Sequence, residues 1–191
     1  MTVALAGDTM LGRGVAAVLE SAPPESLFAP EVVAAAREAD LVLLNLECCI
    51  STRAERWPDP TKPFFFRAPP EAVEALSLLG VDCVTLANNH ALDFGPVALV
   101  DTLDYLHGAG TETVGAGADE HEARRPTVLE ANGFRLGVVG VTDHPAEYAA
   151  GPGGPVWRSR SSVAAFRTGS PRRSRASTST RSSSHRTEGR T

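Results

Sequence analysis

The sequence predicts an α/β protein, and two observations support that prediction. Four short runs, at residues 3–6, 41–46, 83–87 and 136–141, are almost continuously apolar, which is typical of strands buried on both faces of a sheet. A segment with helical spacing lies between each run and the next, and such alternation is typical of βαβ units. We therefore expect strands at these four places.

Three helices are expected between the strands. The first spans residues 31–37. The second, at residues 71–79, follows two adjacent prolines, which suit the start of a helix because the first backbone N–H groups need no partner within it. The third, at residues 97–106, follows Gly95 and Pro96 in the same way. On this prediction, strands end where polar clusters begin.

The charge distribution divides the chain near residue 150. Residues 1–150 contain 9 basic and 22 acidic residues, whereas residues 151–191 contain 9 arginines and a single acidic residue, Glu188. The second segment also contains ten serines and five threonines. This composition buries too little apolar surface to offset the entropy lost on ordering. We therefore expect a folded domain over 1–150 and a disordered tail over 151–191.

Two further interpretations apply to the tail. Its arginines would attract nucleic acid, but no aromatic platform or RNA-binding motif accompanies them, so no nucleic-acid partner is expected. Alternatively, the tail is the product of a frameshift. With the reading frame moved by two bases, codons compatible with residues 180–187 can encode an apolar strand followed by Pro-His.

Cysteine usage and hydropathy limit the class of protein further. Cys48, Cys49 and Cys83 have no CxxC spacing, so we expect thiols buried in the core rather than metal ligands or a redox pair. No run of about 18 apolar residues and no signal-like segment is seen. The sequence therefore predicts a cytoplasmic chain without a membrane segment.

Polar clusters follow three of the expected strands. Asp8 follows the first strand, Asn45 and Glu47 end the second, and a cluster that contains Asn89 and His90 follows the third. Ligands of open α/β sheets bind at the carboxyl ends of the strands. Carboxylate, amide and imidazole donors suit Mn²⁺, Mg²⁺, Fe²⁺ or Zn²⁺. We therefore expect a divalent metal site at this edge of the sheet.

Each cluster also has a purely structural interpretation. Asp8 could cap a helix, and Asn88 with Asn89, or Asp93 with Gly95, could form turns. A single histidine is also more often structural than a metal ligand. The joint occurrence of the three clusters at successive strand ends favours a functional site, because independent turns do not require it.

These motifs resemble those of the CapA, or poly-γ-glutamate capsule synthesis, family. They read GDTMLGR from Gly7, LVLLNLE from Leu41 and LANNHALDFG from Leu86, with GAG at residues 115–117 downstream. The resemblance covers roughly residues 2–145. It implies the fold of the calcineurin-like metallophosphoesterases, which is a β-sandwich flanked by helices with a metal site at the strand ends.

The resemblance also implies roles for individual residues. Asp8 stands at the first metal ligand, Asn45 or Glu47 at the bridging carboxylate, and Asn89 at the asparagine ligand. His90 stands at the histidine that meets the phosphate and protonates a leaving group. The implied substrate is a small-molecule phosphoester or an anionic polymer, and the implied cofactor is a divalent metal ion.

The chain also departs from the family pattern. Met10 stands where the superfamily has a histidine, and the later His-Trp-Gly and Gly-His-x-x-His motifs are missing. We therefore expect an incomplete metal site in a truncated domain, with apolar surface exposed on residues 41–46 and 136–141. The alternative functions are a non-catalytic polymer-binding or assembly protein and an inactive remnant.

Overall fold

The computed structural model describes residues 1–143, 156–157 and 167–169, and it confirms the α/β class. The strands are β1 (Val3–Thr9), β2 (Leu41–Leu46), β3 (Cys49–Ile50), β4 (Arg67–Ala68), β5 (Cys83–Thr85), β6 (Glu112–Val114), β7 (Ala116–Gly117), β8 (Thr127–Ala131), β9 (Phe134–Val138), β10 (Val156–Trp157) and β11 (Arg167–Gly169). The helices are α1 (Gly14–Leu19), α2 (Pro30–Arg37), α3 (Ala72–Leu79), α4 (Gly95–Gly108) and α5 (Glu120–Arg124), with a 3-10 turn, η1, at Pro24–Leu27.

The central sheet is parallel, with strand order β1-β2-β5-β6. Its register places Asp8 opposite Asn45, and Asn45 opposite Thr85. An irregularity between Ala6 and Asp8 shifts the register of β1 by one residue, as a β-bulge does. The carboxyl ends of β1, β2 and β5 therefore lie side by side.

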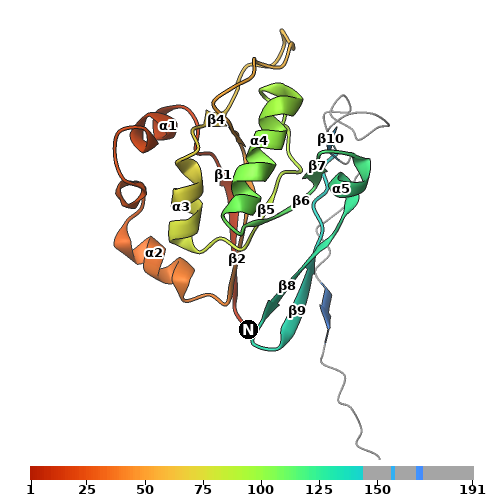
Figure 1. Ribbon diagram of the computed structural model, residues 1–191. Helices are drawn as coiled ribbons and strands as arrows, with labels where there is room; N and C mark the ends of the chain where they lie inside the picture. Colours follow the sequence, from red (N-terminus) through yellow and green to blue (C-terminus); the bar gives the residue numbers. More distant parts are fainter. Residues whose placement is uncertain (144–155, 158–166, 170–191) are drawn as a thin grey trace, which may run out of the picture.

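Different elements cover the two faces of this sheet (Figure 1). Helices α1 to α4 lie on one side, and the β8–β9 hairpin lies on the other. The side chains of β2 alternate accordingly: Val42, Leu44 and Leu46 join the core beneath the helices, and Leu41 and Leu43 join the core beneath the hairpin. Strand β2 is buried on both faces, which accounts for its continuous apolar run.

The expected exposure of apolar surface on residues 41–46 and 136–141 is largely wrong. Leu43 is 6% exposed, Leu136 is 2% exposed and Val138 is 7% exposed. The physical reason is the β8–β9 hairpin, which covers the second face of the sheet. The large apolar side chain that is exposed in the central sheet is instead Leu5 on the edge strand β1, at 63%.

Strand β9 differs from its prediction in its bounds. It spans Phe134–Val138 rather than residues 136–141, and it pairs antiparallel with β8. The two-residue turn between these strands is Asn132-Gly133, and both residues have positive φ, 51° and 76°. An Asn-Gly pair favours this type of hairpin because both residues tolerate left-handed backbone. The Asn-Gly dipeptide was therefore the sequence feature from which the hairpin could have been predicted.

The three predicted helices are present as α2, α3 and α4. Helix α4 is longer than predicted, because Gly95 and Pro96 belong to its first turn instead of preceding it. Helices α1 and α5 and the η1 turn were not predicted. They are short, and short helices depend on tertiary packing more than on local preference.

Two short segments of the Arg-rich part of the chain pair with the body. Strand β10 is antiparallel to β7, and β11 is antiparallel to β9. With β8 and β9, β11 forms a second, three-stranded sheet. The expected domain boundary at residue 150 and most of the expected disordered tail fall outside the described residues.

In the part of the chain that the structure describes, no helix is both long enough and apolar enough to cross a membrane.

The three cysteines are free and buried, which confirms that they are core thiols. Burial raises the pKa of the Cys48 thiol to about 12 and that of the Cys83 thiol to about 12. Burial also raises the pKa of Cys49, and the neighbouring Cys48 raises it further. Because the thiolate is the reactive form, these side chains are poorly suited to nucleophilic or redox chemistry.

We expect the three thiols to be unreactive toward a chromogenic disulfide reagent in the native chain at about pH 8, where ordinary thiols are substantially ionised. The measurement is the number of thiols modified over time. The denatured chain is the control, and it should release three equivalents. Rapid modification of even one thiol in the native chain would show that this part of the core is open.

Candidate functional site

Six polar side chains gather where β1, β2 and β5 end, and we call them the strand-end cluster. They are Asp8, Asn45, Glu47, Asn88, His90 and Asp93. Four of the five residues predicted from sequence belong to it. The fifth, Asn89, contributes its backbone carbonyl, which accepts a hydrogen bond from Lys62 Nζ at 2.6 Å.

Asn45 lies at the centre of this cluster. Its Nδ2 donates to Asp8 Oδ1 at 2.9 Å and to Glu47 Oε1 at 2.6 Å. Its Oδ1 accepts from Asn88 Nδ2 at 2.9 Å. This one amide therefore connects the end of β1, the end of β2 and the loop after β5.

The orientation of Asn88 determines that of Asn45. Asn88 is 5% exposed; its Nδ2 also donates to the Leu46 carbonyl at 2.9 Å, and its Oδ1 accepts from the His90 backbone N–H at 2.9 Å. A carbonyl can only accept and an N–H can only donate, so this amide has one orientation. The nitrogen of Asn45 must then face the two carboxylates.

His90 is held from two sides. Its Nδ1 lies 2.8 Å from Asp93 Oδ2, and its ring stacks on Phe66 with the ring centroids 4.1 Å apart. An ionised carboxylate only accepts hydrogen bonds, so Nδ1 carries the proton. The other ring nitrogen, Nε2, lies 3.9 Å from Glu47 Oε2.

Asp93 is fully buried and connects three parts of the chain. Besides His90, its Oδ2 accepts from the Phe66 backbone N–H at 2.6 Å. Its Oδ1 lies 3.0 Å from Lys62 Nζ in an ion pair, although that contact lacks hydrogen-bond geometry. Residues 51–66, which we call the strap, are thereby held against the strand-end cluster. Lys62 was not predicted as a site residue because it lies outside all three motifs.

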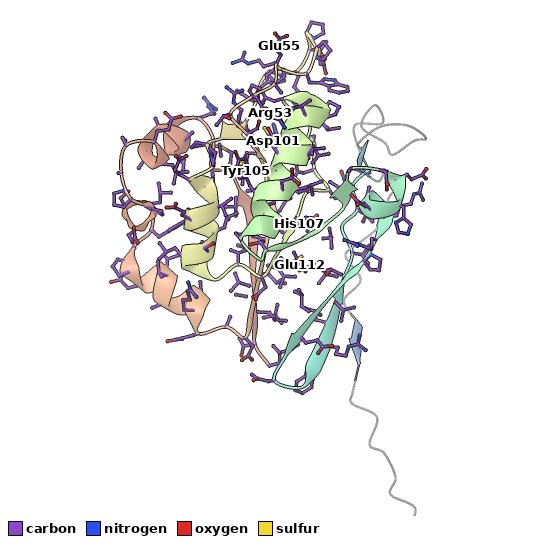
Figure 2. All side chains as sticks on the ribbon, in the orientation of Figure 1. Arg53, Glu55, Asp101, Tyr105, His107 and Glu112 are labelled. Carbon is purple, nitrogen blue, oxygen red and sulfur yellow. The ribbon has the colours of Figure 1, made fainter. Side chains whose placement is uncertain are left out.

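Near its start, the strap is also bound to helix α4. Arg53 Nε lies 2.9 Å from Asp101 Oδ2, and Ser51 Oγ donates to the same oxygen at 2.6 Å. The bond from Arg53 holds the pKa of the Asp101 carboxyl below its ordinary value. Figure 2 shows Arg53 and Asp101 together beside the upper part of α4. Two ion pairs of different burial therefore hold the strap.

The Asn45 amide nitrogen holds two carboxylates close together, because it donates one hydrogen to each of them. Burial raises the pKa of Glu47 above its ordinary value, the hydrogen bond from Asn45 lowers it, and the nearby Asp8 carboxylate raises it again. Two negative charges this close favour protonation of one of them, or a bound cation. Asp8 is exposed, so a cation could reach the pair from solvent.

The described residues fit a divalent metal ion only in part. Asp8 and Glu47 supply two hard oxygen donors, which suit Mg²⁺ or Mn²⁺. Within residues 1–143 and the two short strands beyond, however, no group of three or more His, Cys, Asp or Glu side chains could hold an ion. A complete site would therefore need donors in addition to these.

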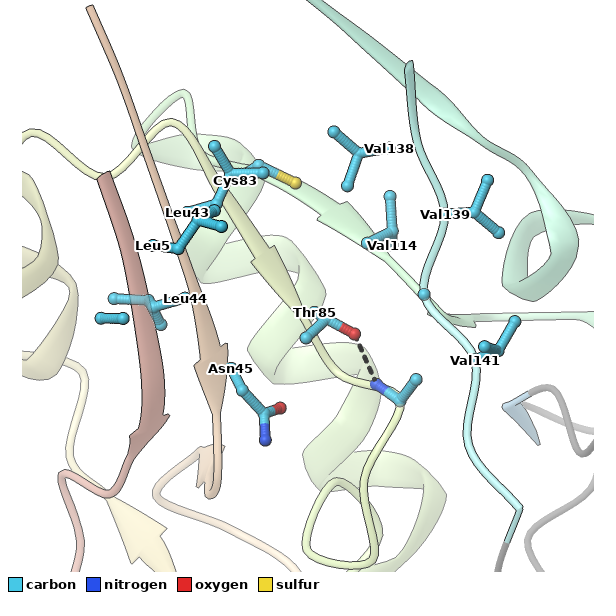
Figure 3. A pocket seen from close by; sticks show the side chains of 13 residues that line it. Leu5, Leu43, Leu44, Asn45, Cys83, Thr85, Val114, Val138, Val139 and Val141 are labelled. Carbon is cyan, nitrogen blue, oxygen red and sulfur yellow. Dashed lines mark hydrogen bonds between the residues drawn. The ribbon is translucent and has the colours of Figure 1, made fainter. Parts of the chain in front are cut away.

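An apolar hollow adjoins the strand-end cluster on the hairpin side of the sheet (Figure 3). Its volume is about 370 Å³, and its walls include Leu5, Leu43, Val114, Val138 and Val139. Asn45 stands at one edge of the hollow. A ligand that contacts the cluster therefore meets an apolar surface beside it.

Comparison with known proteins identifies the family. The family described as "Bacterial capsule synthesis protein PGA_cap" matches residues 2–185, and the chain belongs to this family. A "Probable polyglutamine synthesis accessory protein" of Mycobacterium tuberculosis is 34% identical over 172 residues, which cover 73% of this chain and 45% of that protein. The chain also matches the "PGA biosynthesis protein CapA" of Bacillus subtilis, at 28% identity over 75% of this chain and 37% of that protein.

A further relative agrees with this assignment. The "Capsule biosynthesis protein CapA" of Bacillus anthracis is 27% identical over 75% of this chain and 35% of its own length. The chain thus spans less than half the length of these curated relatives. The CapA-like resemblance expected from the motifs is confirmed.

Proposed function

We propose that this chain serves the biosynthesis of a bacterial capsule polymer and that the strand-end cluster is part of a metallophosphoesterase-type hydrolytic site. One observation carries the second half of the proposal: Asp8, Glu47 and His90 belong to one network at the ends of adjacent parallel strands. Membership of the capsule synthesis family supports the first half. The substrate would be a small-molecule phosphoester or an anionic polymer.

Asp8 and Glu47 would hold a divalent ion (Mn, Fe, Zn or Mg), with Asn89 as the expected amide ligand. Asn45 would position the two carboxylates, because its nitrogen faces them. When bound, such an ion would supply a water of lowered pKa and neutralise charge on the substrate.

His90 would protonate the leaving group. Asp93 holds the proton on Nδ1, so Nε2 is the nitrogen that points away from Asp93 and can exchange a proton with the substrate. The buried carboxylate would also stabilise the imidazolium that forms when Nε2 is protonated. Phe66 restricts the ring to this orientation by stacking on it.

The alternative is that the chain binds or assembles the polymer without catalysis, or that it is an inactive remnant. The observation that favours it is the partial donor set, because the described residues bring two carboxylates together but no third ligand of comparable strength. Two ligands hold an ion weakly and leave its geometry open.

Metal binding separates the two functions. Titration of the full chain with Mn²⁺, followed by electron paramagnetic resonance, should show a site that Asp8→Asn and Glu47→Gln each weaken about 10-fold or more. Asp104→Asn, an exposed carboxylate on α4, is the matched control and should change nothing. Absence of a site in the unmodified chain would support the non-catalytic function, and equal affinity in all variants would disprove the assignment of Asp8 and Glu47.

A further inference from the structure

A second hollow is lined by residues of α1, the strap and β4. It has a volume of about 460 Å³. We call it the arginine pocket, and its lining includes Arg13, Arg56, Arg67, Glu20, Phe65 and Phe94. A pocket of this size accommodates more than a single inorganic ion.

The three arginines of this pocket have no acidic partner among the described residues. Of the six other Lys and Arg residues in residues 1–143, four do have one: Arg53, Lys62, Arg124 and Arg135. The three positive charges outnumber the single carboxylate of the lining, Glu20, so an anion bound between the arginines would be stabilised.

Aromatic rings hold each of the three guanidinium groups. The pairs are Arg13 over Phe64 at 5.6 Å, Arg56 over Phe65 at 5.2 Å and Arg67 over Phe94 at 4.4 Å from the ring centroid. A guanidinium stacked on a ring keeps its N–H edge available for hydrogen bonds. A single donor of the three groups is used within the described residues, from Arg67 Nη1 to the Ala54 carbonyl at 3.3 Å.

The end of the first sequence motif lies against β4, beside the pocket. A Cβ atom at Gly12 would lie 3.0 Å from the Arg67 nitrogen and 3.1 Å from its carbonyl oxygen, so the two backbones approach more closely than most side chains would allow. The next residue, Arg13, has a φ of 54°, a conformation rare outside glycine. The close approach brings Arg13 next to β4, where Arg67 lies.

We infer that the arginine pocket binds a carboxylate-rich polymer chain. Arginine edges bind carboxylates in a bidentate manner, and Glu20 in the same pocket could accept a hydrogen bond from an amide N–H. A γ-linked glutamate chain offers both carboxylates and amide N–H groups, whereas a phosphate offers acceptors only. The choice of this polymer rests on the proposed function in capsule synthesis.

Fluorescence anisotropy with a labelled γ-linked glutamate oligomer tests this inference on the full chain. Arg13→Gln and Arg56→Gln should each weaken binding about 10-fold, because each removes charge-assisted hydrogen bonds. Both side chains are exposed, so the fold should tolerate the changes, which circular dichroism can verify. Arg124→Gln, the same change of charge on α5, is the matched control and should bind as the unmodified chain does.

The inference would be wrong if the oligomer did not bind, or if the pocket variants bound it as well as the control does. It would also be wrong if inorganic phosphate or polyphosphate displaced the oligomer at a lower concentration than unlabelled oligomer does. The Mn²⁺ titration distinguishes failure of this inference from failure of the proposed metal site. The arginine variants should leave Mn²⁺ binding unchanged, whereas Asp8→Asn should leave oligomer binding largely unchanged.

Discussion

Replacement of Asp93 by alanine should lower the free energy of unfolding by about 3–5 kcal/mol, because it breaks a buried ion pair from one side. Lys62 would keep its charge with a side chain that is 9% exposed. The Phe66 N–H and His90 Nδ1 would lose their acceptor as well. Each buried group that loses Asp93 as its partner costs desolvation free energy, so the loss should be large.

Urea unfolding monitored by circular dichroism measures this change. Asp104→Asn is the control for loss of an exposed carboxylate, and its effect should be within about 0.5 kcal/mol. Adding Lys62→Met to Asp93→Ala should recover part of the lost stability, since the buried ammonium that lost Asp93 as its partner is then removed. A midpoint for Asp93→Ala equal to that of the control would show that Asp93 does not hold the strap.

The second prediction concerns the phosphoesterase activity of the chain. We expect the 191-residue chain to have little or no phosphoesterase activity, and a version with the reading frame corrected after about residue 153 to exceed it by orders of magnitude. An ion held by two carboxylates would place its water poorly, and misplaced reacting groups lose most of their rate advantage. The corrected frame can encode Pro-His after an apolar strand.

Hydrolysis of a chromogenic phosphoester with Mn²⁺ present measures this difference between the two versions. Asp8→Ala and His90→Ala in the corrected version serve as controls and should abolish its activity. Equal metal-dependent turnover by the 191-residue chain, lost in the same two variants, would prove the site complete as it stands. A gene sequence without an open alternative frame would separately disprove the frameshift hypothesis.

Local sequence was sufficient to predict the central part of the fold. The apolar run at β2 matches its predicted bounds, because a strand buried on both faces has no polar position along its length except near its end. Asp8, Asn45, Glu47 and His90 could be expected to lie together because each stands at or shortly after the end of a strand whose direction the βαβ pattern determines. The family could be identified for a related reason, since its motifs are short, contiguous and located at these strand ends.

Some features could be found only in the tertiary structure. No local pattern indicates that Lys62 pairs with Asp93, because the strap brings them together from 31 positions apart in the sequence. The β8–β9 hairpin covers a face that the sequence left open.

For Asn45, the sequence by itself determined that a polar side chain stands at the end of β2, but left open whether its oxygen or its nitrogen faces Asp8 and Glu47. Asn88 decides this through its bonds to the Leu46 carbonyl and the His90 N–H. The physical reason is that the donor and acceptor roles of an amide depend on the groups packed around it, and those groups come from different strands.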